Sequence, residues 1–133
     1  MINTKIIKLA SDTINEGLKN ISTHKSSIKN KNCGDKIEIE IVVKNNQIKS
    51  FRYSTKSCVY SNASASILSK KIRLFSIDNL KKDINIFYSI LKNNNINLPK
   101  KYNCFKDLIN TQNKARKDCI TLPFNALLKA LKI

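Results

Sequence analysis

Three cysteines and an aspartate of this chain could bind a soft metal ion or carry sulfur: Cys33, Asp35, Cys58 and Cys119. Cys33 and Asp35 stand on either side of Gly34, just ahead of the alternating stretch IEIEIVV. Because glycine has no Cβ and tolerates positive φ, a turn at Gly34 can make both flanking side chains face one point. The pair is therefore either half of a metal site or an ordinary turn that contains a cysteine.

These four side chains are predicted to lie at the ends of secondary structure elements. Cys33 and Asp35 lead into a strand. Cys58 stands between a hairpin and a helix, and Cys119 comes just before the last helix. Since loops on rigid supports present reactive groups, the thiols and the carboxylate could converge. Their spacing is no guide, because intervals of 25 and 61 residues do not match a compact zinc finger. Each cysteine taken alone could also be a small buried apolar residue.

The first half of the chain contains the patterns of a helix and a sheet. Residues 4–18 are predicted to form an amphipathic helix with a core-facing stripe of Ile7, Ala10, Ile14 and Leu18. Residues 22–31 are polar and are predicted to form an edge strand. From Lys36 the chain alternates as a strand, with Ile37, Ile39, Ile41 and Val43 on one face and Glu38 and Glu40 on the other. Asn45 and Asn46 tolerate a left-handed backbone and are predicted to turn the chain into a further strand, with Phe51, Tyr53 and Thr55 on one face.

The second half is predicted to be helical. The Ala- and Ser-rich run after Cys58 forms one helix, and the next has an apolar face of Leu80, Ile84, Phe87 and Leu91. A loop is predicted over 93–103 and a short helical piece over 105–109. The last helix has Pro123 in its first turn and an apolar stripe of Phe124, Leu127, Leu128 and Leu131. We therefore expect an α+β fold in which a small antiparallel sheet of about three strands packs against several helices.

Length and composition favour one domain over residues 1–133, because only two Gly and two Pro are present and no linker is evident. No stretch reaches the roughly 18 consecutive apolar residues of a membrane span, and no signal peptide is recognisable at the start. We expect a cytoplasmic protein with no membrane association, whose thiols are reduced or metal-bound.

The formal net charge of +16 could indicate a nucleic-acid partner. Lysine is spread over nearly every segment, however, together with much Asn and Ile, as in chains from AT-rich genomes. No nucleic-acid recognition motif accompanies it. We expect no specific nucleic-acid partner, and a basic nucleic-acid-binding domain is kept as an alternative.

Three stretches of the sequence carry a resemblance to a known family: NCGDKIEIEIVV, SCVYSNASASIL and ARKDCITLPFNALLKAL. Read in this order, they resemble the iron-sulfur cluster scaffold family of IscU-type proteins and NifU N-terminal domains. The likeness spans about residues 31–131. It implies a small α+β domain whose ligands are Cys33, Asp35, Cys58 and Cys119. Cys104 has no counterpart among those ligands and is interpreted as a partly buried free thiol.

The resemblance implies a scaffold without turnover of its own. It would assemble iron and sulfide into a nascent [2Fe-2S] cluster, take sulfur from a cysteine desulfurase and pass the cluster to apo iron-sulfur proteins or downstream carriers. The chain lacks the Leu-Pro-Pro-Val-Lys chaperone motif of IscU-type members and has Asp118 where they usually have His. It therefore looks more like the SUF-associated, SufU-like branch. Resemblance to that branch implies an alternative function, in which the site binds zinc in place of iron. The protein would then accept persulfide sulfur from the desulfurase, as a sulfurtransferase does.

Overall fold

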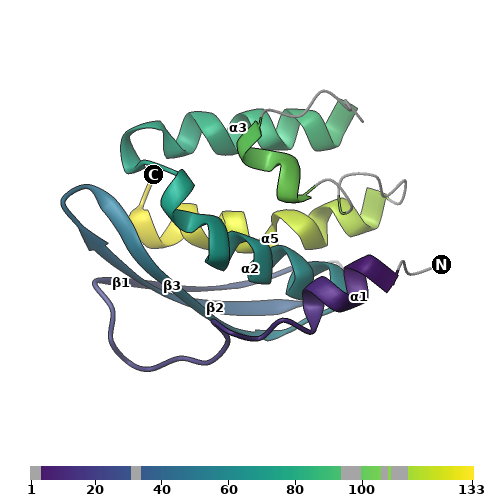
Figure 1. The fold of residues 1–133 in the computed structure, drawn as a ribbon, viewed down its shortest axis with the longest axis horizontal. Helices are drawn as coiled ribbons and strands as arrows, with labels where there is room; N and C mark the ends of the chain where they lie inside the picture. The colour runs from purple at the N-terminus through teal and green to yellow at the C-terminus, as the bar shows by residue number, and fades with distance from the viewer. Residues whose placement is uncertain (1–3, 31–33, 94–99, 106–107, 109–113) are drawn as a thin grey trace.

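The computed structural model of the chain describes residues 4–30, 34–93, 100–105, 108 and 114–133 (Figure 1). Within these residues one helix comes first, three strands follow, and the later elements are helices. This arrangement confirms the predicted α+β class, including the antiparallel sheet and the C-terminal helix. Among the described helices, none is both long enough and apolar enough to cross a membrane.

The sheet of the described chain has three antiparallel strands in the order β1-β2-β3. The strands span His24–Lys29 (β1), Lys36–Lys44 (β2) and Gln47–Lys56 (β3). Asn45 and Asn46 join β2 to β3 with φ values of 54° and 60°. Two left-handed residues in succession match the right-handed twist of the flanking strands, and asparagine tolerates them. The predicted edge strand and hairpin are both confirmed.

One face of the sheet is apolar, as the alternation predicts. Its buried residues are Ile37, Ile39, Ile41, Ile48, Phe51 and Tyr53. Val43 is only half-buried, because the pairing of β2 with β3 shifts register between Val42 and Val43. The apolar face packs against the helices and forms the centre of the core.

Two helices, α2 (Val59–Lys71) and α5 (Lys114–Leu131), lie next to the sheet, and α3 (Ile77–Asn93) lies beyond them (Figure 1). Short 3-10 helices follow α2 (η1, Ile72–Leu74) and precede α5 (η2, Lys100–Phe105). The predicted stripe of α3 is confirmed, since all four of its residues are buried. Phe87 of α3 lies 5.1 Å from Phe105 and 4.6 Å from Phe124, measured between ring centroids. These rings tie α3 and η2 to α5.

The predicted N-terminal helix is shorter than the sequence pattern indicates. It spans Thr4–Ala10 (α1), and Ile6 is its buried residue. The predicted stripe over 4–18 is therefore wrong: Ile7 is 47% exposed, Ile14 70% and Leu18 36%. The chain leaves the helix because its backbone bonds elsewhere. The Ser66 hydroxyl of α2 donates to the Asp12 carbonyl at 2.9 Å, and the Tyr53 N–H donates to the Asn15 carbonyl at 3.4 Å.

After α1 the chain crosses the sheet face that points away from the helices (Figure 1). The Arg52 guanidinium donates to the carbonyls of Glu16 at 2.7 Å and Gly17 at 2.8 Å. The Glu40 carboxylate accepts the N–H groups of Lys19 at 2.7 Å and Asn20 at 3.2 Å. Glu40 lies on the predicted polar face, yet it is only 5% exposed because this segment covers it.

The predicted loop over 93–103 and the helical piece over 105–109 fall largely outside the described residues. Within the first, the chain from Lys100 onward forms η2. Within the second, Phe105 ends η2, and Phe105 and Leu108 are buried.

Candidate metal centre

Asp35 immediately precedes β2, in the turn that connects β1 to β2. The Gly34 N–H donates to the Asn30 carbonyl at 2.8 Å, and the Asn30 N–H donates to the Asp35 carbonyl at 2.7 Å. Gly34 has φ +76°, as predicted, and a Cβ there would meet no atom within 4 Å. Glycine is therefore required at this position by the positive φ of the backbone and not by a lack of space for a side chain. In this turn Asp35 is buried, with 8% of the residue exposed.

Cys58 is the N-cap residue of α2, where β3 passes into the helix. This position confirms the prediction from the sequence. Its backbone is extended, with φ −71° and ψ 169°, and its carbonyl accepts the Asn62 N–H at 3.1 Å as the first turn closes. Asn62 also bonds backward: its side-chain amide N–H donates to the Ser57 carbonyl at 3.4 Å. These bonds fix the half-buried Cys58 at the start of the helix.

Cys119 lies within α5 and not just before it, so the prediction for its position is wrong. The helix begins at Lys114, and Pro123 lies well inside it instead of in its first turn. An internal proline is costly because it has no N–H for the carbonyl four residues earlier. For Pro123 that carbonyl belongs to Cys119.

Helix α2 donates two hydrogen bonds to α5 near Pro123, and the first replaces the N–H that the Cys119 carbonyl lacks. The Ser61 hydroxyl donates to the Cys119 carbonyl at 2.8 Å, and the Ser64 hydroxyl donates to the Ile120 carbonyl at 2.7 Å. Both serines are fully buried. These bonds explain how the helix continues through a proline and carries Cys119 on its buried side.

Replacing Ser64 with Ala is expected to destabilise the protein by about 1 kcal/mol, because a buried hydrogen bond from α2 to the Ile120 carbonyl is lost. Chemical denaturation of the metal-free protein measures the change in the free energy of unfolding. The exposed Ser54 of β3 provides a matched Ser54→Ala control that should change it by less than about 0.5 kcal/mol. Equal stabilities of the two variants would contradict the role assigned to the Ser64 hydroxyl.

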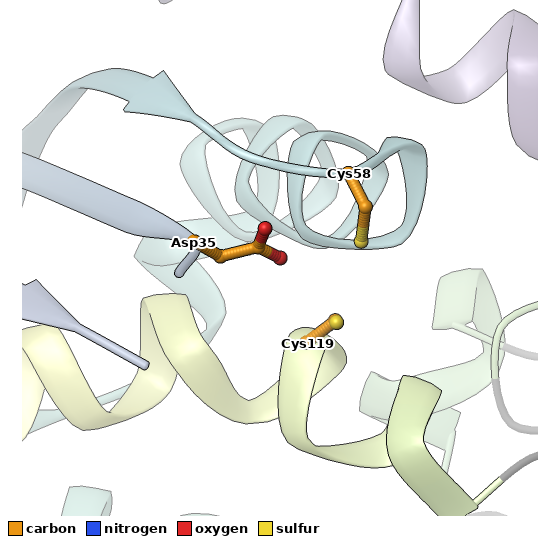
Figure 2. A group of neighbouring side chains, drawn as sticks. All are labelled: Asp35, Cys58 and Cys119. Atoms are coloured by element: carbon orange, nitrogen blue, oxygen red, sulfur yellow. The ribbon is translucent and has the colours of Figure 1, made fainter. Parts of the chain in front are cut away.

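Asp35, Cys58 and Cys119 converge on one point, and we call these three residues the ligand group. One ligand atom from each, a carboxylate oxygen or a sulfur, lies within 4.8 Å of the others. Figure 2 shows the two thiols pointing toward each other from α2 and α5, with the carboxylate directed at the space beside them. Cys33 lies outside the described residues. The structure thus brings together three of the four predicted ligands.

The pKa of the Cys119 thiol is raised, first because the thiol is buried and then because Cys58 and Asp35 lie beside it. Two sulfurs and a carboxylate at this separation repel one another when ionised. A cation among them would reverse that effect and favour the thiolate. The donor set therefore fits a soft metal ion.

Ser61 and Pro123 are parts of this site that the sequence patterns did not single out. Ser61 is three residues after Cys58, on the same side of the helix, and Pro123 is four residues after Cys119. The spacing between Cys119 and Pro123 could have indicated the missing hydrogen bond, because a proline at i+4 removes the donor for the carbonyl at i. The serine that replaces this donor belongs to another helix, so only the fold identifies it.

The profile of the NifU-like N-terminal domain family matches residues 1–132. The chain belongs to this family. The match confirms the resemblance that the three cysteine-containing stretches indicate. No curated protein shows a detectable match to the sequence.

Solved structures support the same fold for this NifU-like domain. The N-terminal NifU-like protein of Brucella abortus superposes with a TM-score of 0.82 at 20% identity, over 98% of this chain and 91% of that one. A hypothetical protein gives 0.81 at 21% identity, over 99% and 100%. A protein of Fervidobacterium islandicum, described as a candidate iron-sulfur cluster assembly scaffold for the SUF system, gives 0.77 at 20% identity, over 98% and 96%. At these identities the likeness establishes the fold.

Proposed function

We propose that this NifU-like domain is a scaffold that assembles a nascent [2Fe-2S] cluster on Cys33, Asp35, Cys58 and Cys119 and passes it to other proteins. The convergence of the ligand group from three distant parts of the chain carries the proposal. Membership of the NifU-like family supports it. Cys33 is included because it stands two residues before Asp35 and completes the Cys-Gly-Asp stretch that resembles the family motif.

The mixed donor set suits a cluster that must be released. Four thiolates hold an iron-sulfide unit firmly, as in electron carriers. The carboxylate of Asp35 is a harder ligand than a thiolate, so it provides one weaker position. A thiolate of the recipient could enter there and replace the scaffold ligands one at a time.

Sulfur would come from a cysteine desulfurase as a persulfide. A thiolate of the scaffold attacks the outer sulfur, a new S–S bond forms, and the desulfurase thiolate leaves. Conversion of this sulfur to sulfide needs two electrons from an external reductant such as a dithiol. The recipients are apo iron-sulfur proteins or downstream carriers, and the domain performs no turnover of its own. We place the process in the cytoplasm, where thiols stay reduced, and treat residues 1–133 as one domain.

Anaerobic reconstitution with ferrous iron, the desulfurase, cysteine and a dithiol reductant tests the proposal. We expect a coloured protein with equal amounts of iron and sulfide and a visible spectrum of a [2Fe-2S] cluster. The cluster should move to an apo-ferredoxin, which is measured by the activity or spectrum that the ferredoxin gains. A protein that binds neither iron nor sulfide under these conditions would contradict the proposal.

A zinc-binding sulfur acceptor is the second candidate, favoured by the same donors, because thiolates and a carboxylate also suit tetrahedral zinc. In that case one cysteine would leave the metal to take persulfide sulfur. Metal analysis of the anaerobically purified protein separates the candidates: tightly held zinc without sulfide favours the acceptor. A basic nucleic-acid-binding domain remains the weakest alternative. DNA binding that survives moderate salt, with no loss of function in Cys58→Ser, would favour it.

A further inference from the structure

We propose that the hydroxyl of Ser61 positions the Asp35 carboxylate for the metal and so sets how tightly this oxygen ligand holds. The inference rests on the proposed function, since it assigns a role within the same centre. Ser61 is fully buried, and its Oγ contacts every member of the ligand group. It is therefore a positioning residue that acts through Asp35.

Three contacts converge on the Ser61 oxygen. Its hydroxyl can donate to Asp35 Oδ2 at 3.2 Å or to the Cys119 carbonyl at 2.8 Å. The Cys58 thiol approaches the same oxygen at 4.0 Å, in the direction of an S–H donor. A hydroxyl has one proton to donate and two lone pairs that accept. The carboxylate and the carbonyl therefore share a single proton.

This sharing links the ligand group to the break in α5. Pro123 has no N–H for the Cys119 carbonyl, so the Ser61 proton serves that carbonyl as well as Asp35. A hydrogen bond to one carboxylate oxygen restricts the rotation of the carboxylate. Partners of this kind orient metal ligands, and removing one typically weakens metal binding by about 10- to 100-fold.

Ser64 provides a control that distinguishes a positioning role of Ser61 from a purely structural one. It is on the same helix, equally buried, and donates to the next carbonyl of α5 at 2.7 Å. No described contact joins its hydroxyl to the ligand group. Ser61→Ala and Ser64→Ala thus each remove one buried hydroxyl between α2 and α5, but only the first removes a contact to Asp35.

The test is a titration of the reduced full-length protein with Co²⁺, followed by its visible thiolate and d–d bands, with a competing chelator to measure affinity. Ser61→Ala is expected to weaken Co²⁺ binding by about 10-fold or more and to shift the d–d bands, whereas Ser64→Ala should keep wild-type affinity and bands. If the two variants bind Co²⁺ alike, the inference is overturned.

A double variant controls for damage to the helix. Pro123→Ala restores an N–H for the Cys119 carbonyl, so Pro123→Ala/Ser61→Ala keeps that carbonyl bonded within α5 and leaves the loss of the hydroxyl's contacts to Asp35 and Cys58 as the difference. We expect the double variant to bind Co²⁺ about 10-fold more weakly than Pro123→Ala alone. Equal affinities would show that Ser61 acts only through the helix and would overturn the inference.

The same titration distinguishes this inference from the proposed function. A wild-type protein that develops no thiolate bands with Co²⁺ would contradict the metal centre and the role of Ser61 together. A wild-type protein that binds Co²⁺, with Ser61→Ala unchanged, would contradict only the role of Ser61.

Discussion

Replacing Cys58 with Ser is expected to weaken zinc or Co²⁺ binding by on the order of 100-fold. Structural zinc sites bind with about 10–16 kcal/mol, so each of four ligands contributes on the order of 3 kcal/mol. A serine hydroxyl holds its proton at neutral pH and cannot replace a thiolate. The Cys58 sulfur faces Cys119 and Asp35 from the start of α2, so its loss opens one side of the centre (Figure 2). Chelator competition measures the affinity, and iron and sulfide analysis after reconstitution shows whether a cluster still forms.

Cys104→Ser is the matched control for Cys58→Ser. It makes the same chemical change at the cysteine that has no counterpart among the family ligands. We expect it to keep wild-type metal affinity and cluster content. If Cys104→Ser lost the metal and Cys58→Ser kept it, the assignment of ligands to Cys33, Asp35, Cys58 and Cys119 would be wrong.

Replacing Asp35 with Ala is expected to slow transfer of a reconstituted cluster to apo-ferredoxin by roughly 10-fold, equivalent to about 1.4 kcal/mol in the barrier. The carboxylate is the one oxygen donor among the proposed ligands and provides the position where a recipient thiolate enters. Without it, an incoming ligand must displace a thiolate, which holds iron more firmly. Stopped reactions, separated on an anion-exchange column, give the transfer rate.

Glu38→Ala serves as the control for this experiment. Glu38 lies on β2, the strand that follows Asp35. Its half-buried carboxylate pairs with Lys36 at 3.4 Å and lies outside the ligand group. Its removal should leave the transfer rate unchanged. An Asp35→Ala protein that binds the cluster and transfers it at the wild-type rate would refute the release role and leave the scaffold proposal standing.

Local patterns in the sequence predicted the elements whose stability comes from their own residues. Asn45 and Asn46 adopt the left-handed conformation that their side chains tolerate, and β2 buries its isoleucines on one face. The four apolar residues of α3 recur at helical spacing and are all buried. Spacing and residue type were sufficient there, because strand and helix periods place such residues on one side whatever they pack against.

Local patterns failed where a backbone group bonds to a distant part of the chain. The apolar spacing after Ala10 continues a helix, yet the carbonyls of Asp12 and Asn15 bond to Ser66 of α2 and Tyr53 of β3. In the same way, Pro123 is typical of the first turn of a helix, whereas the Ser61 hydroxyl replaces the missing donor for the Cys119 carbonyl, and α5 begins earlier at Lys114.

For the candidate site, too, the sequence predicted some features and only the tertiary structure decided the others. The sequence by itself identified its chemistry, since thiols, a carboxylate and the glycine between two of them are readable one residue at a time. It did not place Cys119 inside a helix, nor did it show that one serine hydroxyl contacts Asp35, Cys58 and Cys119 together. Those contacts join residues up to 58 positions apart, and they exist only because α2 and α5 pack side by side on one sheet. Packing over such distances follows from the whole core, which no local pattern contains.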